Sequence, residues 1–403
     1  MKHFTRRDFL KLCGSSSIAA ILAACGVTPT PTAMPAPTST ALPTNTPLPT
    51  ATATLTSTPV PTSTATVTAT GTPRIFTLRD YAQAIGFEMG VALSRHDPRQ
   101  MDIYRDQFNT LLITDLEWQR MEPTRGRIIY SSKDANSEDS VAFAMSNKMR
   151  IISSNIVYWG QYPAWLKGSK NLSPVDARNI LTERVRELFL RFKGKIDIWM
   201  VANEFRPSSW GQKEDILLDK LGEEYIDLAF QVAREGDPHA TLIYNDTDNH
   251  LKNSPTTNLT KQLIVRLRSK SLIDGVGLQM HLEGSTPPSK TEVLQVMKEY
   301  EFPLYVTEFD VNMRNVPGSQ AERNQKQARI YADMLESALE SGACRSFTVY
   351  NVGDKYSWLE NPGAGKRYSP NADATPFDDN LQPKPAYFAM LEVLQKFAQQ
   401  KKP

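Results

Sequence analysis

The sequence predicts a (β/α)8 (TIM) barrel, a fold of the α/β class, preceded by an export signal and a disordered linker. Eight short apolar runs alternate with amphipathic helical patterns across residues 74–403. In a domain of this size, that repeat is typical of a closed barrel. No Gly-rich phosphate-binding loop follows any of the runs, which disfavours the alternative, an open doubly wound sheet.

The first 25 residues carry an export pattern. Residues 5–11 contain two adjacent arginines, and a short apolar segment, 18–24, follows them. That segment is too short to span a membrane as a helix. It ends at Leu22-Ala-Ala-Cys25, which is similar to a bacterial lipobox. We therefore expect a twin-arginine lipoprotein signal, lipidation of Cys25, and a location at the cell surface or on a periplasm-facing membrane.

Residues 26–73 consist almost entirely of Thr, Pro, Ala and Ser, without charged or aromatic side chains. Such a composition cannot bury enough apolar surface to offset the entropy lost on ordering, so we expect a disordered tether. Residues 74–403 are then the folded domain. The net charge of +2 and the absence of a basic stripe argue against a nucleic-acid partner, and we expect a monomer.

The sequence gives little sign of a metal or a cofactor. No set of His and Cys residues has the spacing of a zinc site. Asp246-Thr-Asp-Asn249 resembles a calcium loop only weakly, because it lacks the Gly and the distal Glu of that motif. We therefore expect neither metal nor cofactor.

The predicted strands are bounded by changes in hydropathy. They occupy residues 84–92, 110–114, 150–157, 196–202, 241–245, 275–280, 304–309 and 345–351. Helical patterns lie between them, and the longer ones occupy residues 174–192, 222–235, 258–270, 289–300, 321–341 and 385–399. At the first of these, Ser173 is a suitable N-cap and Pro174 fits the first helical position.

Two of the predicted strands end in a carboxylate. The fourth is followed by Asn203 and Glu204, and the seventh ends at Glu308. Because the C-terminal ends of barrel strands meet at one face, we expect these side chains to share a site. A facing pair of carboxylates, one protonated and one ionised, is the arrangement that hydrolyses glycosidic bonds. A structural ion pair or a helix cap would explain one glutamate, but not both with their neighbours.

A histidine and a glutamine follow the sixth predicted strand, next to the seventh. They are His281 and Gln279. A single histidine is more often a core residue than a catalytic one. Here Asp310, two residues after Glu308, can accept a hydrogen bond from the ring and orient it.

These segments, and others around them, resemble in order and spacing those of glycoside hydrolase family 10, the family of retaining β-1,4-xylanases. The matching pieces cover nearly the whole domain. They are 122–126, 161–166, 199–204, 237–246, 273–281, 306–310, 354–358 and 383–387.

The resemblance implies a mechanism with two glutamates. Glu204 would be the general acid/base, and Glu308 the nucleophile that forms a covalent glycosyl-enzyme. Their carboxyl groups would lie about 5 to 5.5 Å apart, and the anomeric configuration would be retained. The implied supporting residues bind the sugar 2-hydroxyl or orient the nucleophile: Asn203, Gln279, His281 and Asp310.

The resemblance is weaker where the family binds the sugars on the glycone side of the scissile bond. A sugar-binding Asn, a Lys, a His, a Trp, a Trp-Gly pair and an Asp of the family are replaced in turn by Thr114, Glu117, Ser154, Tyr158, Tyr350-Asn351 and Met200. If buried, the lost histidine and the inverted charge could each change sugar preference by a few kcal/mol.

Aromatic and polar side chains in this region are the expected substrate contacts. Sugar faces stack on aromatic rings, whereas Trp118 and Trp199 lie in strand-like segments and are expected in the core. Trp165 could also line a subsite. The expected substrate-binding residues are Glu117, Ser154, Tyr158, Gln161, Tyr350 and Trp358.

Three functions are compatible with the sequence. The leading one is a membrane-tethered endo-1,4-β-xylanase whose partner is a plant polysaccharide. A carbohydrate-binding lipoprotein with a degenerate barrel, and a glycosidase of the same fold that acts on another glycan, are the alternatives. The intact pair of glutamates favours an enzyme, and the altered glycone side leaves the glycan open.

Overall fold

The computed structural model describes residues 76–93, 97–132, 136–205, 215–362 and 367–401. The predicted signal, the lipidation site Cys25 and the predicted linker lie outside these residues. Within the described ranges, no helix is both long enough and apolar enough to cross a membrane.

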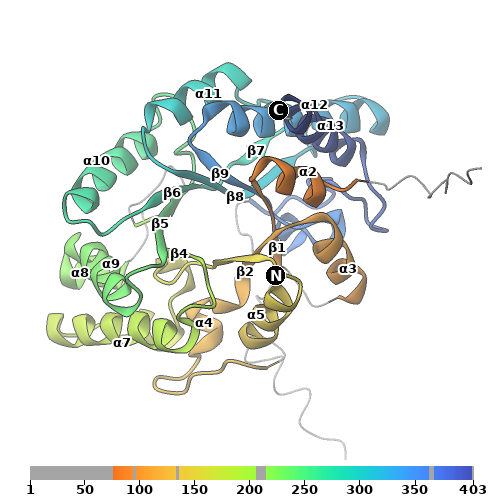
Figure 1. Cartoon of the computed structure of the whole chain (residues 1–403). Helices are drawn as coiled ribbons and strands as arrows, with labels where there is room; N and C mark the ends of the chain where they lie inside the picture. The colour runs from red at the N-terminus through yellow and green to blue at the C-terminus, as the bar shows by residue number, and fades with distance from the viewer. Residues whose placement is uncertain (1–75, 94–96, 133–135, 206–214, 363–366, 402–403) are drawn as a thin grey trace, which may run out of the picture. The chain divides into compact units, whose positions relative to one another are not determined.

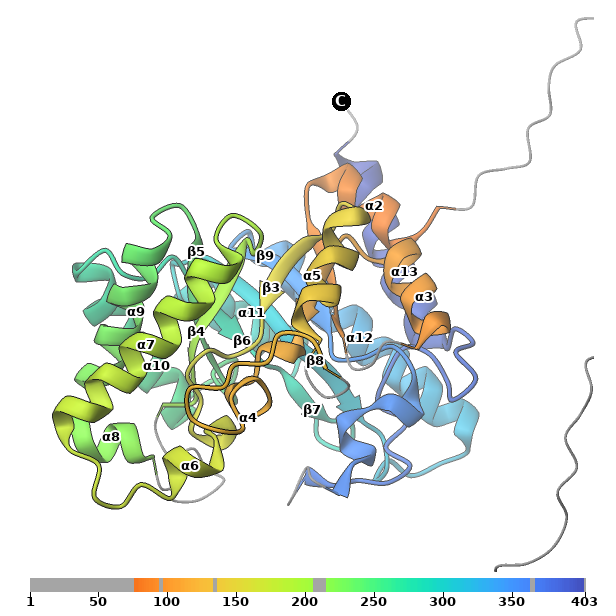
Figure 2. The same ribbon diagram turned by 90° about the horizontal axis from the view of Figure 1, so that it is seen from below.

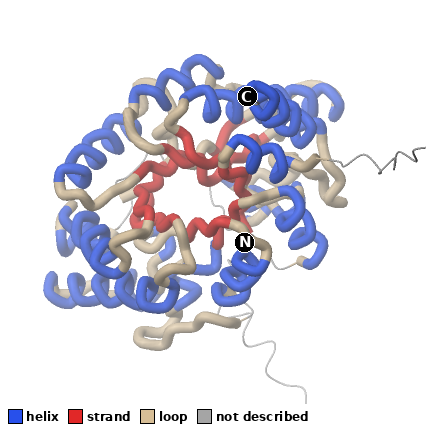
Figure 3. Tube along the Cα trace, viewed as in Figure 1, coloured by secondary structure: helices blue, strands red, loops and turns tan. Residues whose placement is uncertain are grey.

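Eight parallel strands close into a barrel, as Figures 1 and 3 show. Each strand pairs with the next barrel strand along the chain, and the last pairs with the first. The predicted (β/α)8 fold is confirmed. The barrel strands are β1 (Glu88–Leu93), β2 (Thr110–Ile113), β3 (Arg150–Ser153), β4 (Ile198–Asn203), β5 (Thr241–Asp246), β6 (Gly275–Leu278), β8 (Leu304–Asn312) and β9 (Cys344–Val349).

Helices surround the ring of strands (Figures 1 and 2). The described α-helices are α2 (Leu78–Ile85), α3 (Pro98–Gln107), α4 (Trp118–Met121), α5 (Ser137–Ser146), α6 (Ala164–Lys167), α7 (Pro174–Phe192), α8 (Ile216–Leu221), α9 (Glu224–Gly236), α10 (Pro255–Ser269), α11 (Lys290–Glu299), α12 (Gln320–Ser341) and α13 (Pro385–Gln400). Short 3-10 turns follow several strands: η1 (Thr114–Leu116), η2 (Trp159–Gln161), η3 (Asp354–Tyr356) and η4 (Trp358–Glu360).

Most predicted elements are present, and the differences have local causes. Helix α7 has the predicted bounds, and the Ser173 hydroxyl accepts a hydrogen bond from the backbone N–H of Asp176. The first strand begins later than predicted, at Glu88 and not at residue 84. Residues 84–85 end helix α2, which Thr77 caps at its start and Gly86, in the left-handed region, terminates.

The strand that carries Glu308 is longer than predicted. β8 continues four residues beyond Glu308 to Asn312, so this glutamate lies within the strand and does not end it. The added length pairs with β7 (His281–Glu283), a short parallel strand that begins just beyond the end of β6 (Figure 2). β7 therefore fixes His281 beside Asp310, its partner in the strand register.

Two buried apolar clusters follow from the alternation of side chains along each strand, one against the helices and one among the strands. Side chains that point outward pack against helices, and the fully buried Trp199 stacks on Phe189 of α7 with ring centroids 4.3 Å apart. Trp118 is also buried, so both tryptophans belong to the core, as predicted. A separate buried cluster of the strands comprises Ala92, Leu112, Ile152, Ile198, Met200, Ile243 and Tyr305.

Candidate active site

The two glutamates singled out by the sequence lie in one buried cluster. Glu204 directly follows β4 and Glu308 lies in β8, and each is only 8% exposed. Burying a carboxylate is unfavourable unless hydrogen-bond donors surround it. The neighbouring strand ends supply those donors.

The side-chain amide of Asn245, near the end of β5, donates to Glu308. Its Nδ2 donates to Glu308 Oε1 at 2.7 Å and to Asn203 Oδ1 at 2.9 Å. Thr307 Oγ1 donates to Asn245 Oδ1 at 2.7 Å and fixes the orientation of the amide. Asn245 was not among the predicted site residues, although it lies at a barrel strand end and within one of the matching motifs.

The side-chain amide of Gln279 donates to the other carboxylate, that of Glu204. Gln279 Nε2 donates to Glu204 Oε1 at 2.9 Å and to Asn203 Oδ1 at 3.2 Å. Asn203 Oδ1 therefore accepts from both amides and connects the two halves of the cluster. This connected set, Glu308–Asn245–Asn203–Gln279–Glu204, is called the carboxylate network below.

The backbone turns sharply at two points of this network. Glu204 has φ of 45° and Met280 has φ of 60°, both in the left-handed region that is unfavourable for residues other than glycine. Backbone hydrogen bonds hold these turns, because Glu204 N–H donates to Asn245 O at 3.2 Å and Glu308 N–H to Gln279 O at 3.1 Å.

His281 lies between two carboxylates. Its Nδ1 is 2.9 Å from Asp310 Oδ1 and its Nε2 is 3.3 Å from Glu308 Oε2. Trp358 Nε1 donates to the other oxygen of Asp310 at 2.6 Å and fixes that carboxylate. Burial alone would lower the pKa of His281, but the charges and hydrogen bonds of Asp310 and Glu308 outweigh it and raise the pKa to about 9. Near neutral pH the ring is therefore a cation beside Glu308.

Three predicted substrate contacts lie against this cluster. Tyr158 donates its hydroxyl to Glu204 Oε2 at 3.3 Å. The rings of Tyr350 and Trp358 pack on His281, with centroid distances of 5.3 and 4.8 Å. Ser154 follows β3 and is 4% exposed, and its Oγ has no hydrogen-bond partner. Gln161 ends η2, and its buried Oε1 also has no partner.

An open cavity of about 420 Å³ adjoins the cluster at Tyr350 and Trp358. It lies over the C-terminal ends of β9, β1 and β2, and its other lining residues include Thr114, Glu117, Arg120, Asn351, Lys355 and Glu360. Three of the expected substrate-binding residues, Glu117, Tyr350 and Trp358, line this one cavity. The negative charge expected at Glu117 is balanced, because Arg120 Nε forms an ion pair with Glu117 Oε2 at 2.9 Å.

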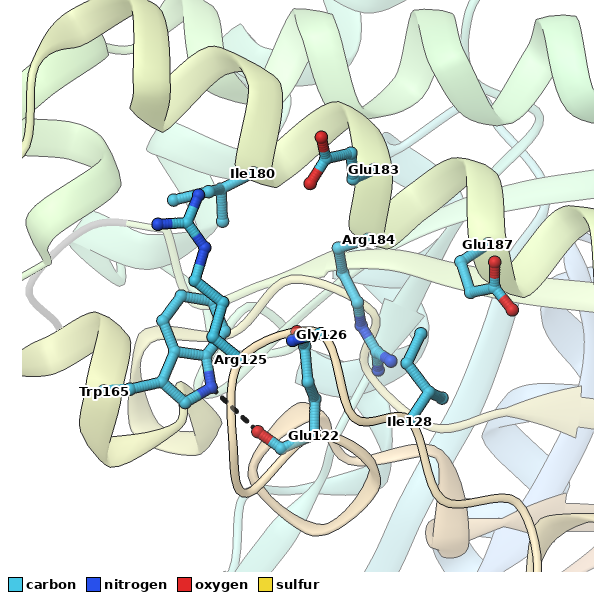
Figure 4. Close-up of a pocket in the computed structure, with 9 residues that line it drawn as sticks. All are labelled: Glu122, Arg125, Gly126, Ile128, Trp165, Ile180, Glu183, Arg184 and Glu187. Carbon is cyan, nitrogen blue, oxygen red and sulfur yellow. Dashed lines mark hydrogen bonds between the residues drawn. The ribbon is translucent and has the colours of Figure 1, made fainter.

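A second pocket, of about 180 Å³, lies elsewhere and contains Trp165 (Figure 4). Its lining residues are all different from those of the first cavity. Trp165 Nε1 donates to the backbone oxygen of Glu122 at 2.9 Å, and the buried Arg184 guanidinium lies 5.4 Å from the Trp118 ring centroid. Trp165 thus packs beside the segment that follows β2 and is not in the cavity with Tyr350.

The segment with weak calcium-loop character has a structural explanation. Asp246 accepts hydrogen bonds from the Tyr244 hydroxyl and from the backbone N–H of Thr247, and it is 6% exposed. Burial raises the pKa of Asp246 well above its usual value. In the described part of the chain, no three His, Cys, Asp or Glu side chains come together as metal ligands.

The first prediction concerns the support of the Asn245 amide. Gly277 of β6 is the register partner of Asn245, and a Cβ there would lie 2.2 Å from Asn245 Oδ1. Gly277→Ala should displace the amide and lower kcat by roughly tenfold or more, since small misplacements near reacting groups are costly. Gly90→Ala is the matched control, because its Cβ would meet Thr348 Oγ1 at 2.4 Å in another part of the barrel. Equal kcat values for the two folded variants would contradict the inference that the Asn245 amide holds Glu308 in position.

The second prediction concerns pH and stability. The pKa of His281 is raised from 6.5 to about 9, so the proton it gains stabilises the folded state fully below pH 6.5. That contribution, about 3 kcal/mol, should be lost as the pH rises through 9. Denaturant unfolding of the protein and of His281→Asn between pH 6.5 and 9.5 measures it. The exposed His239 gives the control His239→Asn. A His281→Asn variant that kept the full pH dependence would refute the assignment.

Comparisons with known proteins agree with this geometry. The sequence profile described as glycosyl hydrolase family 10 matches residues 77–393. Endo-1,4-beta-xylanase B of Thermotoga neapolitana is 33% identical over 331 residues, which are 79% of this chain and 92% of the relative. Endo-1,4-beta-xylanase A of Fusarium oxysporum f. sp. lycopersici is 29% identical over 325 residues, 76% of this chain and 94% of the relative.

A solved structure gives the same result. The crystal structure of xylanase 10B from Thermotoga petrophila RKU-1 in complex with xylobiose is 30% identical, with a TM-score of 0.73. The match covers 81% of this chain and all of that chain. On the sequence profile, the relatives and the barrel, the chain belongs to glycosyl hydrolase family 10 and is a glycoside hydrolase.

Proposed function

We propose that the protein is a retaining endo-1,4-β-xylanase that cleaves xylan by double displacement. The observation that carries the proposal is the carboxylate network, which holds two buried glutamates in one hydrogen-bonded cluster. The named xylanases among the relatives support xylan as the substrate.

In the first step, Glu308 acts as the nucleophile. One of its carboxylate oxygens attacks the anomeric carbon while the bond from that carbon to the leaving oxygen breaks. The carboxylate is held for this attack, because Asn245 donates to Oε1 and His281 lies beside Oε2. Asp310, fixed by Trp358, keeps the ring in that position.

Glu204 is the general acid in this step and the general base in the next. It gives its proton to the leaving oxygen, and later takes a proton from the water that hydrolyses the glycosyl-enzyme. Gln279 and Tyr158, which both donate to Glu204, are neutral, whereas Glu308 faces a cation. This difference in neighbours supports Glu308 as the nucleophile and Glu204 as the acid/base. Asn203 accepts from the amides that reach both glutamates, and the family resemblance gives it the role of binding the sugar 2-hydroxyl.

We also propose that the enzyme is a monomeric lipoprotein. Residues 1–25 would be a twin-arginine signal that ends at the lipidated Cys25, residues 26–73 a disordered tether, and residues 74–403 the catalytic domain. The lipobox-like sequence and the Thr/Pro-rich composition support this arrangement. A tethered barrel at the cell surface or facing the periplasm could reach a polysaccharide too large to enter the cell.

The third prediction tests the reaction. Reducing-end release should be greatest from xylan in a panel of xylans, glucans and mannans. Glu204→Gln should lower kcat by about 10² to 10⁴, the usual contribution of a general acid/base, and Glu308→Gln should abolish turnover. Glu183→Gln, in the second pocket, is the control and should be as active as the unmodified protein. Release from a mannan or glucan but not from xylan would point to a glycosidase of another specificity, and no release at all to a binding protein.

The fourth prediction tests the anchor. Cys25→Ala should leave the precursor unprocessed or release the protein into the soluble fraction, because the acylated residue is gone. Cell fractionation and the mass of the mature N-terminus measure this. A conservative control is Cys13→Ala, which lies upstream of the lipobox-like sequence and should be processed normally. Normal maturation and membrane retention of Cys25→Ala would refute the proposal.

A further inference from the structure

We propose that Arg120 and Asn351 are further substrate contacts that complete the glycone subsite in the 420 Å³ cavity, where Arg120, held by Glu117, supplies the cationic donor. The proposal rests on the proposed function only in taking the ligand to be a neutral sugar chain. It assigns substrate contacts to Arg120 and Asn351, neither of which is among the substrate-binding residues expected from the sequence.

The first observation is the ion pair in the cavity wall. Glu117 follows η1, and Arg120 lies in α4 one helical turn later, so their side chains meet at Nε and Oε2, 2.9 Å apart. The Glu117 side chain is 13% exposed and that of Arg120 is 43% exposed. The buried carboxylate therefore holds the base of the guanidinium, while the more exposed part borders the cavity.

This geometry leaves hydrogen-bond donors for a ligand. A guanidinium has five N–H donors in a rigid fork, and the Glu117 contact uses the one at Nε. The resemblance to family 10 places a lysine at position 117. Here the cation comes from Arg120, three residues later, and Glu117 holds it in place, so the cavity keeps a cationic donor although residue 117 is acidic.

The second observation is independent and concerns a lining residue that follows a different strand. Asn351 follows β9, lines the same cavity and is 3% exposed, yet its Oδ1 has no hydrogen-bond partner. A buried acceptor without a donor is unfavourable, by about 1–3 kcal/mol. Asn351 also has φ of 85°, in the left-handed region, where glycine is more favourable. The position thus carries a strained amide whose acceptor a ligand hydroxyl could satisfy.

The combination selects the class of ligand. Arg120 offers donors, and Asn351 offers an acceptor. Tyr350 and Trp358 add aromatic rings to the same cavity. Sugar hydroxyls both donate and accept, and sugar faces stack on aromatic rings, so a neutral glycosyl residue fits all of these groups. Because Glu117 balances the charge of Arg120, the ligand needs no charge of its own.

One consequence differs from what the sequence alone suggests. By resemblance, Glu117→Lys made together with Ser154→His would restore two family residues and improve xylan hydrolysis. In this structure Glu117→Lys would place a second cation next to Arg120 and remove the carboxylate that holds it. We therefore expect Glu117→Lys to weaken sugar binding.

The fifth prediction is tested by binding in the inactive Glu308→Gln protein. Isothermal titration with xylotetraose, cellotetraose and mannotetraose gives a Kd for each. Arg120→Ala and Asn351→Gly should each raise the Kd of the tightest-bound tetrasaccharide by roughly tenfold, the usual effect of losing such a hydrogen bond. Arg125→Ala, which removes a cation from the second pocket, should leave it unchanged.

The outcomes separate this proposal from the proposed function. Glycine suits the backbone of position 351 and removes the unpaired acceptor, so Asn351→Gly should raise the thermal midpoint, and a higher Kd of this stable variant reports lost binding. If Asn351→Gly and Arg120→Ala both bind as tightly as their parent, or if no tetrasaccharide binds the parent, the subsite is refuted. Weaker binding of cellotetraose or mannotetraose by both variants, together with no hydrolysis of xylan by the unmodified protein, would support the subsite and refute the xylanase.

Discussion

The arrangement of the site depends on one constraint, which is that two carboxylates are buried close together and need donors within reach. Asn203 Oδ1 meets this need indirectly, because it accepts from the amides of Asn245 and Gln279 and so directs each toward one glutamate. Each amide then uses the same nitrogen on a carboxylate. Replacing any one of these side chains would leave a buried partner unsatisfied, and that is costly in a low-dielectric interior.

The barrel makes this network possible because β4, β5, β6 and β8 are successive neighbours in the ring. The ends of β4, β5 and β6 therefore bring Asn203, Asn245 and Gln279 beside Glu308, which lies within β8. Gly277 leaves room for the Asn245 side chain, and the left-handed turn at Glu204 redirects the chain at the end of its strand. Fold and site are thus linked through particular backbone positions.

The sequence predicted the barrel and the carboxylate pair because both depend on local signals, namely apolar runs and polar residues at their ends. The resemblance also grouped Glu117 with Tyr350 and Trp358, and all three line the 420 Å³ cavity. It did not identify Asn245 as part of the site, since an asparagine at a strand end has several ordinary explanations. The Glu117–Arg120 ion pair was not predicted, because the family resemblance concerns only the residue at position 117. The extra strand β7 escaped prediction because three residues are too few for a recognisable pattern.

The proposed double displacement requires that Glu308 attacks the sugar directly and that Glu204 serves as its acid/base partner. Proton NMR of the first product released from a xylo-oligosaccharide tests this most directly, before mutarotation scrambles the anomers. Double displacement inverts the anomeric carbon twice, so the new reducing end should appear first as the β-anomer. Initial release of the α-anomer would mean that water attacks in a single step, and it would contradict the assignment of Glu308 as nucleophile.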